Sequence, residues 1–184
     1  MRYVLRVVVP LTTEGWDEKR QEFVEPKVQV LQLEHSLVSL SKWESKWCKP
    51  FLTKGLQTTE EILDYVKFMT LTQNVNPEVY NHITQDIVDE ITEYINAPMT
   101  ATTINDEKSD KGRGEIVTAE LIYYWMISLN IPFECQKWHL NRLLTLVRVC
   151  NVKNSPPKKR SKKELMRRNT AMNALRKQQL NTKG

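Results

Sequence analysis

Few residues in this chain have the types and spacing that metal binding or catalysis requires. Cys135 and His139 are four residues apart, which on a helix would place two ligands on one side, as in zinc sites. A zinc ion needs further ligands, and the sequence has neither a Cys-x-x-Cys nor a His-x-x-x-His pair to supply them. We therefore predict no metal site and interpret Cys135 as a buried thiol and His139 as a hydrogen-bonded side chain.

Pairs of acidic residues are the remaining candidates for acid–base chemistry or cation binding. Each pair falls at an expected helix start, on an outward helix face or in a loop, so we expect solvated side chains. The pairs are Glu60/Glu61, Asp89/Glu90 and Asp106/Glu107. The Gly112-x-Gly114 run lacks a preceding strand and a third glycine, so it does not indicate dinucleotide binding. The sequence predicts a non-enzymatic protein with no catalytic residue and no cofactor.

Charge is divided unevenly along the chain. Residues 151–184 carry eleven Lys/Arg and one acid, a net charge of +10, whereas residues 1–150 carry sixteen bases and twenty-one acids, a net charge of −5. An acidic body followed by a basic arm is typical of proteins that bind a charged partner. The predicted partner-binding residues are Lys158, Lys159, Arg160, Lys162, Lys163, Arg167, Arg168, Arg176 and Lys177.

The composition of the arm is compatible with more than one partner. An acidic protein surface and nucleic acid would both attract its charge. The arm contains no aromatic residue, so it lacks the stacking platforms that bind single strands. The alternative is that the arm binds nothing foreign and is a solvated tail or a strap on the acidic body. All of these interpretations stay open on composition alone.

The elements that position these residues begin with a short β-hairpin. A β-branched run at residues 3–9 and an alternating run at residues 23–33 predict its strands, with Pro26 indicating a late start or an edge position. Helices follow, and capping residues mark where they begin. The expected helical segments are residues 36–49, 58–71, a short one from Asn76, 84–97, 118–129, 134–149 and 161–180.

The sequence therefore predicts a mainly α fold: a helical domain with a small N-terminal β-hairpin and a basic C-terminal helical arm. The body covers residues 1–150, with the hairpin in residues 1–35, and the arm covers 151–184; two prolines at 156 and 157 mark the boundary. Three widely spaced cysteines predict free thiols and a reducing compartment. No run approaches the roughly 18 apolar residues of a membrane span, so we expect no membrane association.

Four runs of sequence resemble a family of small tailed-bacteriophage proteins from the tail-morphogenesis region, the tail assembly chaperone-like proteins. They are residues 33–47 (LEHSLVSLSKWESKW), 94–103 (YINAPMTATT), 131–146 (IPFECQKWHLNRLLTL) and 173–184 (NALRKQQLNTKG). The family provides no catalytic motif to carry over. Its hallmark residues here are expected to fix the core and the contacts between helices. They are Trp43, Trp47, Trp138, His139, Asn141 and Arg142.

The resemblance implies a chaperone that binds the tape-measure protein or another tail protein, such as the tail-tube protein, in the host cytoplasm during phage assembly. Binding would place an amphipathic helix in a groove. A first alternative is a structural virion protein at a tail or connector interface, where the basic arm would strap a neighbouring subunit. Copies of the chain itself, in a homo-oligomer, are a further candidate partner. A second alternative is a nucleic-acid-binding accessory protein that acts through the basic arm.

Overall fold

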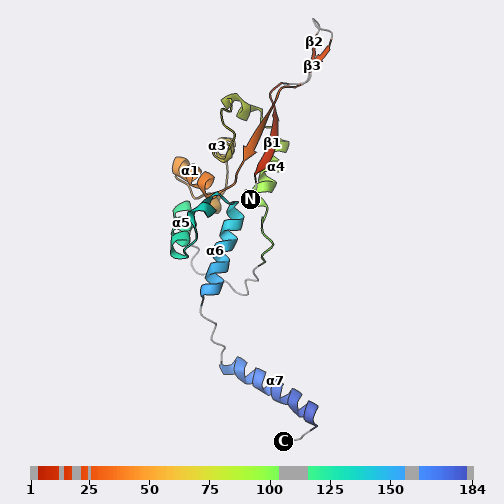
Figure 1. Ribbon diagram of the computed structural model, residues 1–184, viewed down its shortest axis with the longest axis vertical. Helices are drawn as coiled ribbons and strands as arrows, with labels where there is room; N and C mark the ends of the chain where they lie inside the picture. The colour runs from red at the N-terminus through yellow and green to blue at the C-terminus, as the bar shows by residue number, and fades with distance from the viewer. Residues whose placement is uncertain are drawn as a thin grey trace. The chain divides into compact units, whose positions relative to one another are not determined.

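The computed structural model describes residues 4–12, 15–17, 22–24, 26–103, 116–155 and 162–181. It divides into two compact units, Met1–Asn151 and Val152–Gly184. The described residues are mainly helical and include a small N-terminal hairpin, which confirms the predicted fold class (Figure 1). Among them, no helix combines the length and the apolar character needed to cross a bilayer.

The N-terminal hairpin pairs strand β1 (Leu5–Pro10) with strand β4 (Val28–Leu33) in antiparallel register, from Leu5 opposite Leu33 to Pro10 opposite Val28. Alternate residues point to opposite faces. One face is therefore buried, at Val7, Val9, Leu31 and Leu33. The other face is exposed to solvent.

The second strand of this hairpin begins late, as Pro26 indicated. The structure divides the run predicted at residues 23–33 into β3 (Glu22–Val24) and β4. Strand β3 pairs instead with β2 (Gly15–Asp17) in a second small hairpin. Pro26 lies between the two strands and has no N–H to donate, so it cannot continue the ladder.

Helices form the rest of the body. They are α1 (Leu37–Trp47), α2 (Phe51–Lys54), α3 (Thr59–Met69), the 3-10 helix η1 (Pro77–His82), α4 (Gln85–Asn96), α5 (Ala119–Ser128), the 3-10 helix η2 (Phe133–Lys137) and α6 (Leu140–Asn154). Five of the predicted helical segments begin at residues that the structure places at N-caps, namely Ser36, Thr58, Asn76, Thr84 and Thr118. The Thr58–Glu61 capping box is also present, so local sequence determines where α3 begins.

The helix predicted at residues 134–149 is wrong in its first part. Residues 133–137 form η2, and α6 begins only at Leu140. His139 lies in an isolated antiparallel bridge with Ser36, and the Leu140 N–H donates to the His35 carbonyl at 2.9 Å. These contacts with a segment a hundred residues away replace local helical bonds, and a local sequence pattern does not reveal them.

A buried carboxylate joins three helices of the body. Glu44 of α1 accepts hydrogen bonds from the Phe51 N–H at 2.8 Å and from the Ala119 N–H at 2.7 Å. Both donors lie in the first turn of a helix, α2 and α5, where N–H groups lack intrahelical partners and attract negative charge. Glu44 thereby fixes the starts of two helices that are 68 residues apart in the chain.

The core packs around the same helix. Trp43 is fully buried, stacks on Trp47 and donates from its indole nitrogen to the Glu61 carbonyl at 3.1 Å. The Arg142 guanidinium lies 4.4 Å from the centre of the Trp138 ring. Trp43 thus lies in the core, Trp47 and Trp138 are half-buried, and Arg142 is exposed and contacts Trp138.

The second unit contains helix α7 (Lys162–Leu180). The prediction placed its cap at Ser161, which lies outside the described residues. All side chains from Met166 to Asn181 are exposed, including Met166, Met172, Leu175 and Leu180.

We expect the Glu44→Gln variant to be less stable by about 2–3 kcal/mol. A glutamine side chain has only one oxygen, so either the Phe51 N–H or the Ala119 N–H would face an NH2 group and lose its acceptor. Urea unfolding of the full chain measures the difference. The matched control is Glu93→Gln, which changes an exposed side chain of α4. Equal stability of the two variants would contradict the role of Glu44.

The end of α1 offers a stabilising change. Cys48 has a φ of 50°, in the left-handed region that favours glycine. We expect Cys48→Gly to raise the free energy of unfolding by about 0.5–1 kcal/mol. Cys48→Ala keeps the Cβ atom and the backbone strain, so thermal or urea unfolding should show no such gain for this control.

Candidate partner-binding sites

The predicted partner-binding residues are only partly within the described structure. Lys158, Lys159 and Arg160 lie outside it, and Lys162 and Lys163 begin α7. The remaining four, Arg167, Arg168, Arg176 and Lys177, are exposed on α7. The structure therefore places the described members of the set on one continuous helix.

These four cations do not form a single stripe. Successive residues of a helix are separated by about 100°, so neighbouring pairs such as Arg167 and Arg168 point to different sides. The apolar side chains of Met166, Met172 and Leu175 are distributed between them. A partner can therefore meet both charge and apolar surface from several directions around α7.

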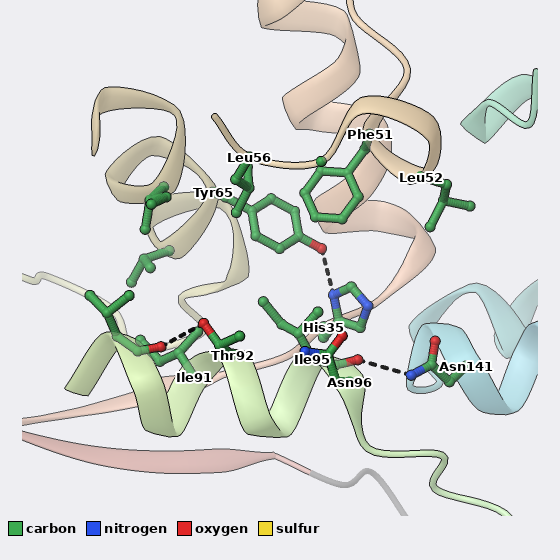
Figure 2. Close-up of a pocket in the computed structure, with 14 residues that line it drawn as sticks. His35, Phe51, Leu52, Leu56, Tyr65, Ile91, Thr92, Ile95, Asn96 and Asn141 are labelled. Atoms are coloured by element: carbon green, nitrogen blue, oxygen red, sulfur yellow. Dashed lines mark hydrogen bonds between the residues drawn. The ribbon is translucent and has the colours of Figure 1, made fainter. Parts of the chain in front are cut away.

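The body contains a pocket that the sequence analysis did not identify. Its volume is about 590 Å³, within the range of ligand and side-chain sites. It lies between the α2–α3 segment and α4, beside the start of α6 (Figure 2). Its lining is mostly apolar, and the labelled residues include Phe51, Leu56, Ile91 and Ile95.

His35 and Tyr65 meet at one wall of this pocket. The Tyr65 hydroxyl lies 2.6 Å from the His35 Nδ1, and both side chains are buried (Figure 2). Burial, with the neighbouring ring of His139, lowers the pKa of His35 to about 3. Burial likewise raises the pKa of Tyr65. The pair is therefore neutral at physiological pH, which suits binding of an uncharged group and leaves no general acid or base with a pKa near 7.

His139 packs behind His35, with ring centres 5.0 Å apart. Its Nε2 lies 3.0 Å from the Tyr94 carbonyl, and its Nδ1 accepts from the Asn141 N–H at 3.3 Å. The proton of the neutral ring is therefore on Nε2. Burial lowers the pKa of His139 below its usual value, against the effect of the Tyr94 carbonyl.

The Cys135–His139 pair does not form the arrangement that the spacing suggested. Cys135 is buried in η2, while His139 follows that element and bonds to α4. Burial, with Glu134, raises the pKa of the Cys135 thiol. Both residues match the structural interpretation of a buried thiol and a hydrogen-bonded histidine. Among the described residues, no group of three or more His, Cys, Asp or Glu side chains is placed to hold a metal ion.

The expectation of solvated acidic pairs is wrong for one residue. Glu60, Asp89 and Glu90 are exposed, and Asp106 and Glu107 lie outside the described residues. Glu61, by contrast, is only 1% exposed. It accepts from the Gln57 N–H at 2.8 Å and from the Lys49 ammonium at 2.5 Å, and this Lys49 hydrogen bond is the main cause of its lowered pKa. Its carboxylate caps α3, and both of its oxygens accept hydrogen bonds.

The two buried histidines predict a dependence of stability on pH. Their folded pKa values lie below the unfolded value near 6.5, so the unfolded chain takes up protons first as the pH falls. We expect full stability above about pH 6.5 and a loss beginning just below it. For His35 the loss reaches as much as about 5 kcal/mol near pH 3, at about 1.4 kcal/mol per pKa unit.

Urea unfolding between pH 7 and pH 5 tests this dependence, because ordinary carboxylates remain ionised over most of that range. His35→Gln should reduce the slope of stability against pH, whatever its effect on stability at pH 7. The control His82→Gln changes an exposed histidine and should leave the slope unchanged. A wild-type slope of zero would contradict the assignment.

Comparison with known proteins does not identify a family for this chain. No protein-family model, no curated protein and no solved structure matches the chain. The features of the chain that bear on function are its charge division, helix α7 and the pocket of the body.

Proposed function

We propose that the protein is a non-enzymatic bacteriophage tail-assembly protein, a chaperone that binds the tape-measure protein or another tail protein. The observation that carries this proposal is the exposure of every described side chain of α7 from Met166 onward. The phage context comes from the resemblance of the four sequence runs. The binding role comes from the residues themselves.

Helix α7 has the properties of a segment that is completed by a partner. Isolated helices are marginal in water unless they bury an apolar face. Met166, Met172, Leu175 and Leu180 are between 44% and 70% exposed, so they leave apolar surface to be covered. A partner that covers these side chains would bury apolar surface. Acidic groups of the same partner would form ion pairs with Arg167 and the neighbouring basic residues.

Such binding is suited to release. Ordering an arm on a partner costs about 2–5 kcal/mol of the gross interaction energy, so the complex is weaker than its contact area suggests. A chaperone of tail assembly must leave its client when the tail polymerises. The apolar pocket beside His35 offers the body a second place to receive a client side chain or helix edge.

Nucleic acid is the second candidate partner, and the observation in its favour is the basic character of α7. Arg167, Arg168, Arg176 and Lys177 are all exposed, and Lys162 and Lys163 belong to the same helix. Duplex binding by about four phosphate contacts would weaken strongly with salt, with a slope near 0.9 per contact. The virion-protein alternative differs from both in leaving the chain in the finished particle.

We expect the tagged full chain, captured from infected cells, to bring down a tail protein that survives nuclease treatment and to be absent from purified virions. Mass spectrometry of both samples measures this. Stoichiometric chain in virions would instead support the structural alternative. Capture that disappears with nuclease would support the nucleic-acid alternative.

Two double variants of α7 separate the contribution of apolar surface to capture from the contribution of charge. Met172→Ser with Leu175→Ser removes apolar surface and should reduce capture of a tail protein several-fold. Arg176→Gln with Lys177→Gln removes two charges from the same stretch and should affect capture mainly at low salt. Unchanged capture by both variants would contradict a role for α7.

A further inference from the structure

The pocket between α3 and α4 has a lining that carries no charge at physiological pH. Its walls are mainly aliphatic and aromatic, and none of the described residues that line it is Asp, Glu, Lys or Arg. The histidine of this lining, His35, is neutral because burial lowers its pKa to about 3. A charged ligand would lose its hydration without gaining a counter-ion, so the pocket favours an uncharged one.

The hydrogen bond with Tyr65 fixes which nitrogen of His35 carries the proton. The Tyr65 hydroxyl lies 2.6 Å from Nδ1 and has one proton to donate. The nearby Ser39 hydroxyl already accepts from the Ser36 N–H at 3.0 Å and donates to the Ser36 carbonyl at 2.8 Å, which leaves Nδ1 as the acceptor for Tyr65. A neutral imidazole has a single ring N–H, so this proton is on Nε2 and makes Nε2 a donor.

The Nε2 donor of His35 has no hydrogen-bond acceptor among the residues that the structure describes. Figure 2 shows this second ring nitrogen on the side away from Tyr65, toward Leu52 and Asn141, which both line the pocket. His35 itself is only 1% exposed. A buried N–H without an acceptor is costly, so the pocket contains a polar group that a ligand would satisfy.

Asn141 supplies an acceptor at the same end of the pocket (Figure 2). Both hydrogens of its amide are used, because Nδ2 donates to the Ile95 carbonyl at 2.9 Å and to the Ala97 carbonyl at 2.8 Å. These bonds fix the orientation of the side chain, and within the described ranges they leave Oδ1 without a donor. The pocket therefore offers one donor and one acceptor on otherwise mainly apolar walls.

We propose that this pocket binds a small, uncharged and largely apolar molecule whose polar head accepts a hydrogen bond from His35 Nε2 and donates one to Asn141 Oδ1. Alcohols and primary amides have such a head, and the apolar walls cover the rest of the molecule. The volume of about 590 Å³ lies within the range of small-molecule sites. This inference does not rest on the tail-assembly role, because it concerns a ligand of the isolated chain.

A side chain of a client enters this pocket without completing it. Leucine or phenylalanine would cover the walls but leave the His35 N–H buried without an acceptor. Asparagine or glutamine has the polar head but too little apolar surface for the walls. Tyrosine combines a ring with a hydroxyl, so it is the side chain that the experiment must distinguish from a small molecule.

Three probes of nearly equal size test the chemistry of the head. Heptanamide accepts and donates, 2-octanone only accepts, and heptanoate is charged. In titrations of the full wild-type chain at pH 7, followed by NMR shifts of the backbone amides, we expect heptanamide to bind several-fold more tightly than 2-octanone and about tenfold or more tightly than heptanoate. Heptanamide that fails to bind up to its solubility limit, or that binds no better than either other probe, overturns the proposal.

N-acetyltyrosinamide is the probe for a client side chain. We expect it to bind more weakly than heptanamide, because its backbone amides add polar groups that the apolar walls cannot satisfy. Tighter binding of N-acetyltyrosinamide would assign the pocket to a tyrosine of a client protein and overturn the small-molecule proposal.

Two variants of α4 locate the binding. Thr92→Phe and Glu93→Phe place the same ring at neighbouring exposed positions, and Thr92 lines the pocket whereas Glu93 does not. We expect Thr92→Phe to weaken heptanamide binding about tenfold or more by filling the pocket, and Glu93→Phe to leave it unchanged. Urea unfolding checks that both variants are folded. Equal binding by the two variants would place heptanamide elsewhere on the chain and overturn the proposal.

NMR of the histidine side chains tests the donor directly. The sequence has three histidines, and the spectra of His35→Gln and His82→Gln assign their signals. In the free chain at pH 7 we expect the His35 ring to be protonated at Nε2, and we expect the Nε2 signal to shift when heptanamide is added. A proton on Nδ1, or an Nε2 signal that heptanamide leaves unchanged, would contradict the assigned contact.

Discussion

The buried segment from Glu34 to Ser36 is the junction on which the rest of the body depends. Its three residues follow β4 and precede α1, and they bond to α3, to α4 and to the start of α6. The Glu34 N–H reaches the end of α3, and the His35 N–H donates to the Tyr94 hydroxyl of α4 at 3.3 Å. The His35 carbonyl accepts from Leu140 at the start of α6. Because each backbone group of this segment is buried, losing one partner would leave a costly unsatisfied group.

Local chemistry accounts for the parts of the fold that could be predicted. Capping residues such as Thr58 and Thr118 mark helix starts because their side chains satisfy N–H groups within three residues. The alternation of β1 and β4 likewise reflects a local period of two. The start of α6 was missed because the Leu140 N–H bonds to His35, and the burial of Glu61 was missed because Lys49 and Gln57 surround it. Both depend on partners that only the assembled chain brings together.

The candidate sites show the same division. Charge along the chain identified the basic arm, since net charge needs no structure to count. The pocket beside His35 could not be found in this way, because its lining comes from α2, α3, α4 and α6, and each contributes residues that look like ordinary core positions. The signal available in the sequence was a histidine at a strand-to-helix junction, next to Glu34 and Ser36. Only its contact with Tyr65 gives that histidine a defined role.

The position of Glu44 also constrains how the chain folds as it leaves the ribosome. One oxygen of this carboxylate is satisfied by Phe51, which emerges soon afterwards, but the other waits for Ala119, which is 75 residues downstream. Translation at about 5–20 residues per second separates these events by several seconds. Helix α1 therefore completes its surroundings only after α5 has been synthesised. The hydrogen bonding of Glu44 is therefore completed only when both halves of the body are present.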